Sequence, residues 1–375
     1  KEGSKGVETV FRALYQTEPT GVKPLARKVR LPAPILVAVL GELTRLGAVS
    51  RRQGVALTEQ GRRFVQEALG VHSREQWLCQ ACNGRTVTIP ARLRPVVEKL
   101  ASYGRQAPGV DTSLDQAPST PESALRRALV MIRQGAVEGK RVLILGDDDC
   151  VSLAIGLSGQ VLHPGGAFAA RIAVLESDPR WVAHLRAVSS QEGLGIEVIQ
   201  ADLRDPLPGG LRGAFDTFET DPPYTLPGMT LFVSRGVEAL AETVGGQGYL
   251  SLGAAPPGEL LAYQGALTQM GLVVRELLPN FNVYAGASLL AGASHLYCLE
   301  TTEGAFPAIT GPFYEGQIYT GQQNPVLRVY RCMACGQMVK VGQGQAIPTI
   351  EKLKNQGCPA CGGQRFELAV RILRE

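Results

Sequence analysis

The sequence lacks any long apolar run that could form a membrane-spanning helix. Its longest uncharged stretch, residues 277–299, is interrupted by Pro279, Asn280 and several glycines, whereas a bilayer span needs about 20 consecutive, mostly apolar residues. The first residues also lack the apolar segment and the small-residue cleavage site of a secretory signal. We therefore expect a cytoplasmic protein that does not cross a membrane.

A disulfide framework is also missing, although the 375 residues include 8 cysteines. A chain of this length can build two or three apolar cores without covalent cross-links, and its 45% hydrophobic and 19% charged residues are typical of globular proteins. Six of the cysteines form three Cys-x-x-Cys pairs, Cys79/Cys82, Cys332/Cys335 and Cys358/Cys361, and Cys150 and Cys298 stand alone. In a cytoplasmic protein such pairs favour metal binding over disulfides.

Acidic and basic residues are unevenly distributed along the chain. Residues 1–70 carry twelve Lys and Arg against six Asp and Glu, whereas residues 140–310 carry nine against eighteen. The acidic middle can be a solvated surface or can attract a cationic substrate, and the composition alone leaves both interpretations open.

The N-terminal region, residues 1–72, has the pattern of a winged helix-turn-helix. It predicts helices at 7–16, 24–29, 35–46 and 62–69 and two strands around the Gln53–Gly54 turn. Such a module could bind nucleic acid through Arg51 and Arg52. The predicted helix at 35–46 is nearly all apolar and offers few side chains that could read bases, which favours a dimerisation or lid role.

Residues 73–120 predict a Cys-x-x-Cys segment followed by a linker, and residues 121–325 predict a Rossmann-like domain of the methyltransferase type. Apolar strands separated by helices indicate a doubly wound, mostly parallel α/β sheet. Such sheets bind ligands beyond the carboxyl ends of their strands. The expected strands are 142–145, 172–175, 196–199, 215–219, 249–252 and 272–278.

The turn after the first of these strands reads Gly146-Asp147-Asp148-Asp149. A glycine-rich turn that approaches a pyrophosphate is absent, and three carboxylates would repel a phosphate, which disfavours NAD, FAD and nucleoside triphosphates. Capping of the next helix by Asp148 or Asp149 would explain one of these aspartates. Three together favour a cationic ligand.

Acidic residues also follow the second and third strands. Glu176 or Asp178 is placed to reach a ribose hydroxyl, and Asp202 to accept from an adenine amino group. Each position alone could be a solvated carboxylate. Together they favour an adenosine without phosphates, as in S-adenosylmethionine-type ligands.

The fourth strand ends in Asp221-Pro222-Pro223-Tyr224. In such a motif an acidic side chain and backbone carbonyls hold an amino group while an aromatic face packs against it, although a plain proline turn has the same sequence. The motif favours an amine nucleophile placed in line with a sulfonium.

With these motifs the chain resembles the branched-chain polyamine synthases, or N(4)-bis(aminopropyl)spermidine synthases. The matching stretches are residues 78–87, 120–122, 142–149, 215–223 and 280–282. The resemblance covers most of residues 7–300, and the tail after about residue 325 departs from the archaeal members. It implies transfer of aminopropyl groups from decarboxylated S-adenosylmethionine to the secondary amine of spermidine, giving a tertiary and then a quaternary polyamine and releasing 5'-methylthioadenosine.

The resemblance also implies residue roles. Asp148 would lie closest to the attacking nitrogen, with Asp221 opposite it fixing the amine. Since an aliphatic amine titrates near a lysine, at about 10, one carboxylate must act as the base. The remaining substrate-binding residues would be Gly146, Asp147, Asp149, Glu176, Asp178, Asp202, Pro222, Pro223, Tyr224 and Asn282. Asp147, Asp149 and Asp178 would hold terminal ammonium groups. Asn282 and Tyr284 could line an acceptor channel or have core or turn roles; Tyr224 is not fixed in the family, so no role for its hydroxyl carries over.

The C-terminal region, residues 326–375, has the spacing of a four-thiolate zinc ribbon. Cys332/Cys335 and Cys358/Cys361 are separated by twenty-two residues, and a glycine follows each second cysteine. Cys79/Cys82 is half a site, which a second subunit of a homodimer could complete around a metal ion, or which could close as a disulfide. No His or Glu flanks the pairs, so structural roles are expected.

Two other functions fit parts of the sequence. An amino-methyltransferase acting on DNA or RNA also uses Asp-Pro-Pro-Tyr, but three aspartates would face a polyanion. A regulator that senses polyamines through a degenerate enzyme domain would not need carboxylates at every strand end.

Overall fold

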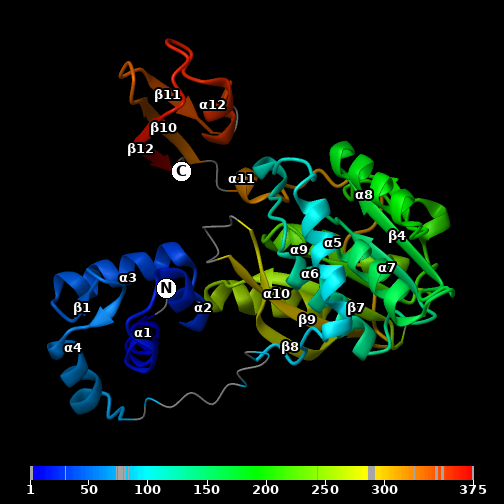
Figure 1. The fold of residues 1–375 in the computed structure, drawn as a ribbon, viewed down its shortest axis with the longest axis horizontal. Coiled ribbons are helices and arrows are strands. Elements are labelled where there is room, and N and C mark those ends of the chain that lie inside the picture. The colour runs from blue at the N-terminus through cyan, green and yellow to red at the C-terminus, as the bar shows by residue number, and fades with distance from the viewer. Residues whose placement is uncertain are drawn as a thin grey trace. The chain divides into compact units, whose positions relative to one another are not determined.

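The computed structural model describes residues 3–29, 31–72, 74, 79, 82, 84–242, 244–285, 292–323, 326–342, 345–347 and 350–373. They form two compact units, and Figure 1 labels many of their elements. Unit 1 comprises Lys1–Pro108, Ala117–Pro222 and Thr230–Phe313, and unit 2 comprises Gly109–Gln116, Pro223–Met229 and Tyr314–Glu375. None of the helices in the described ranges combines the length and the apolar character needed to cross a membrane.

The N-terminal part of unit 1 is a small helical module with its own apolar core. Fully buried Val10, Leu14, Leu36 and Leu40 repeat at helical spacing and hold the helices together. The elements follow the predicted order, but each strand of the hairpin has only two residues, and the winged-helix assignment stays a prediction. The module consists of α1 (Gly3–Thr17), α2 (Val22–Val29), α3 (Ala33–Arg45), β1 (Val49–Ser50), β2 (Ala56–Leu57), α4 (Glu59–Arg63) and the π-helical η1 (Phe64–Ala68).

The larger part of unit 1 is a seven-stranded α/β sheet with the order β5-β4-β3-β6-β7-β9-β8. The first five strands in this order pair in parallel, and β9 runs antiparallel to both of its neighbours. The sheet is therefore mixed. Its strands are β3 (Arg141–Leu145), β4 (Arg171–Glu176), β5 (Glu197–Gln200), β6 (Thr217–Thr220), β7 (Gln247–Gly253), β8 (Leu272–Val283) and β9 (Ala293–Thr301).

The strand β9 was not predicted from the sequence. It lies in the uncharged stretch 277–299, whose proline, asparagines and glycines suggest only an interruption. In the structure this stretch contains the end of β8 and most of β9, and β8 carries register shifts between Val274 and Glu276 and between Leu278 and Asn282. An antiparallel strand inserted beside β7 depends on long-range pairing, which local sequence does not reveal.

Helices pack on the sheet as expected for a doubly wound fold. Side chains of α5 (Arg94–Gly104), α6 (Pro121–Arg133), α7 (Val151–Leu162) and α8 (Pro179–Glu192) share one apolar core with the strands. The helix α5 lies inside the predicted linker region, so this core already begins at Leu93. Two further helices, α9 (Leu226–Ala239) and α10 (Pro257–Gln269), follow β6 and β7.

A side-chain cap begins α6. Thr120 precedes the helix with an extended backbone, and its side chain accepts a hydrogen bond from the backbone N–H of Ser123. The cap satisfies one of the N–H groups that a helix start leaves without a partner. It fixes the first turn of α6, the helix that carries Arg127 into the sheet's carboxyl edge.

Unit 2 contains a three-stranded antiparallel sheet in the order β11-β10-β12. Its small core consists of Val339, Val341, Ile347 and Leu353. Its elements are α11 (Thr320–Gln323), β10 (Val326–Cys332), β11 (Met338–Val341), α12 (Ile350–Gln356) and β12 (Phe366–Leu373).

Candidate active site

The parallel register brings three acidic turns to one edge of the sheet. Leu145 at the end of β3 is level with Leu175 in β4 and with Thr220 in β6. The next residues, Gly146, Glu176 and Asp221, therefore lie side by side at this edge, where Glu176 is the last residue of β4 and the other two follow their strands. Gly146 has φ +75°, a conformation that favours glycine and turns the chain directly after the strand.

The first aspartate of this turn, Asp147, is a helix-capping residue. It is fully buried, and its carboxylate accepts from the backbone N–H of Val151 at 2.7 Å and from Ser152. Burial raises its pKa well above the usual value, although these hydrogen bonds act in the opposite direction. The N-cap position itself is Cys150, whose side chain makes no capping bond. Asp147, rather than Asp148 or Asp149 as the sequence suggested, accepts from the first N–H groups of the helix, because its buried side chain points back toward them.

The third aspartate, Asp149, belongs to a buried ion cluster around Arg127. The Arg127 guanidinium donates through Nη2 to Asp149 and, at 3.1 Å, to Asp221, and through Nη1 to Glu219 at 2.9 Å. The side chains of Arg127 and Glu219 are each only 1% exposed. The cluster therefore joins α6, the turn after β3 and the end of β6.

Asn282 completes the contacts of Arg127. Its Oδ1 accepts from Arg127 Nε at 2.9 Å, and its Nδ2 donates to Ser251 at 2.8 Å and to Ser294 at 2.9 Å. Tyr284 donates to Asp221 at 2.5 Å and also bonds Ser294. The amide of Asn282, fully buried, is thus occupied by protein groups.

The charges in the cluster shift its pKa values. Burial raises the pKa of Glu219 to about 7, although Arg127 acts in the opposite direction. Burial, together with the charge of Asp149, raises the pKa of Asp221 well above its usual value. Burial disfavours the Arg127 cation, but the three carboxylates outweigh it and hold the pKa of Arg127 above its usual value.

Asp148, between the two engaged aspartates, is in a different position. Its carboxylate accepts from the backbone N–H of Ala117 at 3.1 Å, and its residue is partly exposed, whereas its two neighbours are buried. Removal of water around the carboxylate raises its pKa well above the usual value, and the charges of Asp149, Glu176 and Asp221 raise it further. A carboxyl group with a raised pKa is a good proton acceptor near neutral pH.

The predicted nucleoside-binding residues also lie at this edge. Glu176 accepts from the backbone N–H of Asp147 at 3.0 Å and of Asp178 at 2.8 Å, and burial raises its pKa. Asp178 caps α8 and pairs with the Arg180 side chain. These contacts position Glu176 and Asp178, and their contacts with a ligand stay predictions.

Asp202, after β5, forms an ion pair with Arg204. Partial burial acts to raise its pKa, but the hydrogen bonds from Arg204 outweigh it and lower the pKa. The Asp221–Tyr224 motif is divided between the two units, since Pro222 ends a segment of unit 1 and Pro223 and Tyr224 begin a segment of unit 2. The packing of the Tyr224 ring on an amine therefore stays a prediction.

Sequence reasoning missed Arg127 and Glu219. Each carries a signal, because Arg127 occupies the apolar stripe of α6 between buried Ala124 and Met131, and Glu219 interrupts a four-residue buried strand. Charged residues at such positions are almost never fully buried unless they are paired. The sequence shows these two anomalies but not that they meet.

The branched-chain polyamine synthase A C-terminal domain profile matches residues 95–301, more than half of the chain. The chain belongs to the branched-chain polyamine synthase family. The matched range includes every residue of the Arg127 cluster and all three turns of the acidic edge. The resemblance noted from the sequence is thereby confirmed.

Individual relatives support the same family. An uncharacterized protein of Methanocaldococcus jannaschii is 37% identical over 371 residues, which are 99% of this chain and 90% of the relative. The N(4)-bis(aminopropyl)spermidine synthase of Thermococcus kodakarensis is 35% identical over 68% of this chain and 70% of its own length. A solved mutein of the Thermus thermophilus branched-chain polyamine synthase has a TM-score of 0.68 at 29% identity, covering 84% of this chain and 92% of that chain.

Unit 2 brings together four cysteines that lie outside the range matched by the synthase family profile. The Sγ atoms of Cys332 and Cys361 are 3.7 Å apart, as are those of Cys335 and Cys358, and all four lie within 4.8 Å of one another. These separations are too long for disulfides, whose sulfurs are about 2 Å apart, and they suit a shared metal ion. Gly336 and Gly362 have φ of +76° and +72°, as knuckle turns need.

Cys79 and Cys82, the half-site of the prediction, are both free thiols. In the described part of the chain they belong to no group of three or more metal-ligating side chains. A metal ion at this pair would therefore need ligands from elsewhere, such as a second subunit.

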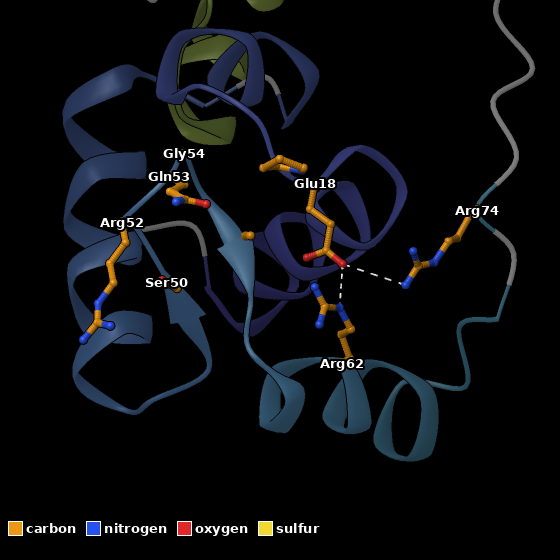
Figure 2. A pocket seen from close by; sticks show the side chains of 9 residues that line it. Glu18, Ser50, Arg52, Gln53, Gly54, Arg62 and Arg74 are labelled. Atoms are coloured by element: carbon orange, nitrogen blue, oxygen red, sulfur yellow. Dashed lines mark hydrogen bonds and ion pairs between the residues drawn. The ribbon is translucent and has the colours of Figure 1, made fainter.

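A separate surface pocket of about 500 Å³ lies in the N-terminal module of this synthase-family chain (Figure 2). Glu18 at its centre accepts from the backbone N–H of Leu57 at 2.6 Å and from Arg62 at 2.8 Å, with Arg74 at 3.8 Å. All lining residues come from the first 74 residues. Glu18 thus ties the hairpin to the following helix, and none of the acidic edge contributes to this pocket.

Proposed function

We propose that this protein transfers aminopropyl groups from decarboxylated S-adenosylmethionine to the secondary amine of spermidine. The products would be N4-aminopropylspermidine, then the bis(aminopropyl) quaternary amine, with 5'-methylthioadenosine released. One observation carries the proposal: the solved Thermus relative, which this chain matches over 84% of its length, is in complex with N4-aminopropylspermidine and 5'-methylthioadenosine. Those two molecules are the products of one aminopropyl transfer.

The charge of the acidic edge supports this substrate class. The donor carries a sulfonium and an ammonium and has lost its carboxylate, and the acceptor is a polycation. Asp148, Asp149, Glu176 and Asp221 meet where the sheet's strands end, and Arg127 neutralises only part of their charge. Clustered carboxylates make the site electrostatically complementary to both substrates.

In the proposed step Asp148 accepts a proton from the protonated secondary amine. The freed nitrogen lone pair attacks the propyl carbon attached to sulfur, a nitrogen–carbon bond forms, and the carbon–sulfur bond breaks with its electron pair going to sulfur. Neutral 5'-methylthioadenosine leaves, and the product is a protonated tertiary amine. A second transfer repeats deprotonation and attack and ends in a quaternary nitrogen, which has no proton to lose. Alignment and deprotonation are sufficient to promote this displacement.

The other site residues have proposed supporting roles. Asp221 would hold the amine opposite Asp148, and Pro222, Pro223 and Tyr224 would border it. Glu176, Asp178 and Asp202 would contact the nucleoside, with Gly146 letting the backbone approach it. Asp149 would face terminal ammonium groups. We propose a positioning role for Asn282, because its amide is already hydrogen-bonded to Arg127, Ser251 and Ser294.

The accessory regions also receive roles by proposal. We assign structural zinc to the four cysteines of unit 2, since four thiolates at this separation match its preference. We infer a winged-helix class for the N-terminal module from its element order. Homodimerisation and a shared metal ion at Cys79 and Cys82 remain our expectation for the half-site.

The test is to incubate the protein with spermidine and either decarboxylated or ordinary S-adenosylmethionine, and to separate the polyamines by chromatography and mass. We expect products heavier by one and two aminopropyl units, together with 5'-methylthioadenosine, from the decarboxylated donor alone. Methylated polyamine, or methylated DNA or RNA in a parallel reaction with ordinary S-adenosylmethionine, would contradict the proposal. No product from either donor would contradict it as well.

The pH dependence of turnover is a further prediction. Asp148 works in its ionised form, so activity is lost as the pH falls through its pKa. Because burial and neighbouring carboxylates raise that pKa, the acidic limb of kcat should lie well above the range of an ordinary aspartate, about 4. Single-turnover rates at saturating substrate measure the limb, and a limb in the ordinary aspartate range would contradict the assignment.

A further inference from the structure

The guanidinium of Arg127 is the only described contact shared by the three carboxylates Asp149, Glu219 and Asp221. We propose that Arg127 is a positioning residue for aminopropyl transfer, which holds these three side chains as a fixed anionic cradle and thereby leaves Asp148 to take the proton. The inference rests on the proposed function and assigns a role to a residue outside the acidic motifs.

The geometry of the guanidinium suits this role. Its planar fork presents several N–H donors in fixed directions, and donors on Nε, Nη1 and Nη2 are directed at Asn282, Glu219 and the pair Asp149 and Asp221. A lysine has one charged nitrogen and could not reach the same set of atoms in one arrangement. The position thus requires arginine for its shape as well as its charge.

The cluster joins parts of the sheet that would otherwise repel one another. Asp149 follows β3 and Asp221 follows β6, and both accept from the same nitrogen, Nη2. Glu219 lies in β6 and Asp221 directly follows the strand, and both side chains accept from the same guanidinium. Without a cation between them, three buried carboxylates could not all remain ionised.

Asn282 holds the guanidinium from the opposite side. Its amide bridges Arg127 to Ser251 in β7 and to Ser294 in β9, and Tyr284 links Ser294 back to Asp221. The network therefore connects α6 with four strands of the sheet. A displacement of about 1 Å in such a site can cost about 10²-fold in rate.

Asp148 stands outside the network. Its described hydrogen bond is to the backbone N–H of Ala117. The charged or titratable groups around it are Asp147, Asp149 and Cys150 on its own segment, Glu176 at the end of β4, Asp221 after β6 and, through its carboxylate partners, Arg127 of α6. Asp147 is engaged as a helix cap and Asp149 by Arg127. Of the three aspartates after β3, Asp148 is therefore the one that is partly exposed and pairs with no described cation.

The test compares Arg127→Met and Arg127→Lys with Arg235→Met. Arg235 is an equally buried arginine, paired with Glu238 at 3.2 Å and with the carbonyl of Leu203 at 2.9 Å, and it contacts no residue of the cradle. We expect Arg127→Met to lower kcat by about 10²-fold and to move its acidic limb to higher pH, because the negative charge that remains on the cradle is then no longer compensated by a cation near Asp148. Arg235→Met should lower the melting temperature without moving the limb.

Arg127→Lys separates charge from shape. It keeps the cation, so its acidic limb should stay near that of the wild type, while its kcat should fall by at least about tenfold because the cradle is no longer held in one geometry. If Arg127→Met does not fold, the kcat of Arg127→Lys still tests whether Arg127 positions the three carboxylates. Wild-type kcat in Arg127→Lys, or a limb in Arg127→Met that matches the wild type, would overturn the inference.

The titration of Asp148 can be followed without any activity. Carboxyl-labelled aspartate in the wild type, in Arg127→Met and in Arg127→Lys gives this pKa directly by nuclear magnetic resonance, and the spectrum of Asp148→Asn assigns the signal. We expect Arg127→Met to raise that pKa relative to the wild type and Arg127→Lys to leave it close. A wild-type protein that makes no branched polyamine would contradict the proposed function, whereas an Asp148 pKa indifferent to Arg127→Met would contradict the inference about Arg127.

Discussion

Asp148→Asn is expected to lower kcat for aminopropyl transfer by about 10²- to 10⁴-fold, the usual contribution of a general base. Asparagine has nearly the same shape as aspartate and cannot accept the proton. It can still accept the backbone hydrogen bond from Ala117 through its carbonyl oxygen. The fold should therefore survive, and the measurement is the initial rate of branched polyamine formation beside the melting temperature.

The control for this variant is Asp205→Asn. Asp205 lies in the loop after β5, and its residue is exposed, so the same chemical change there should leave both rate and melting temperature near those of the wild type. Turnover of Asp148→Asn close to the control would remove Asp148 from the mechanism. Partial activity in Asp148→Glu, which keeps the carboxylate on a longer side chain, would support a role in proton transfer.

Removal of metal from unit 2 should unfold its three-stranded sheet. The sheet's core is small, with buried Val339, Val341, Ile347 and Leu353 beside the cysteines, and structural zinc contributes about 10–16 kcal/mol to the folding of zinc-finger peptides. We expect one zinc ion per chain by elemental analysis. Cys332→Ser combined with Cys358→Ser should abolish it and make residues beyond about 320 sensitive to protease.

Cys298→Ser is the matched control for the cysteine variant. Cys298 is a buried cysteine of β9 outside the four-cysteine cluster, so the variant should keep the zinc ion and the protease resistance of unit 2. A protein purified without zinc whose unit 2 resists protease would contradict the structural role. Loss of the four thiols from a free-thiol titration under native, metal-free conditions would instead indicate two disulfides.

Much of the site could be predicted because parallel strands impose a simple rule. Consecutive strands of a doubly wound sheet end at the same edge, so acidic residues after several strands must meet there. The turns at Asp147, Glu176 and Asp221 obey that rule and lie together in the structure. The cysteine spacing is similarly local, since two knuckles with the right glycines present four thiols to one point.

The division of labour among the aspartates could not be predicted. Three successive aspartates look alike in the sequence, yet Asp147 caps α7, Asp149 pairs with Arg127, and Asp148 keeps some exposure. The role of each aspartate depends on where α7 begins and on where α6 places Arg127. Both are set by packing rather than by the motif.

By itself, the sequence determined the α/β class, the acidic strand ends, the cysteine cluster and the family of the chain, because each is encoded by local periodicity or by short motifs. Only the tertiary structure decided that β9 inserts between β7 and β8 and that Arg127, Glu219 and Asn282 meet beneath the acidic edge. These residues are 63 or more positions apart along the chain. Their contacts arise from long-range strand pairing and from burial of charges that are stable only when brought together, which no local pattern records.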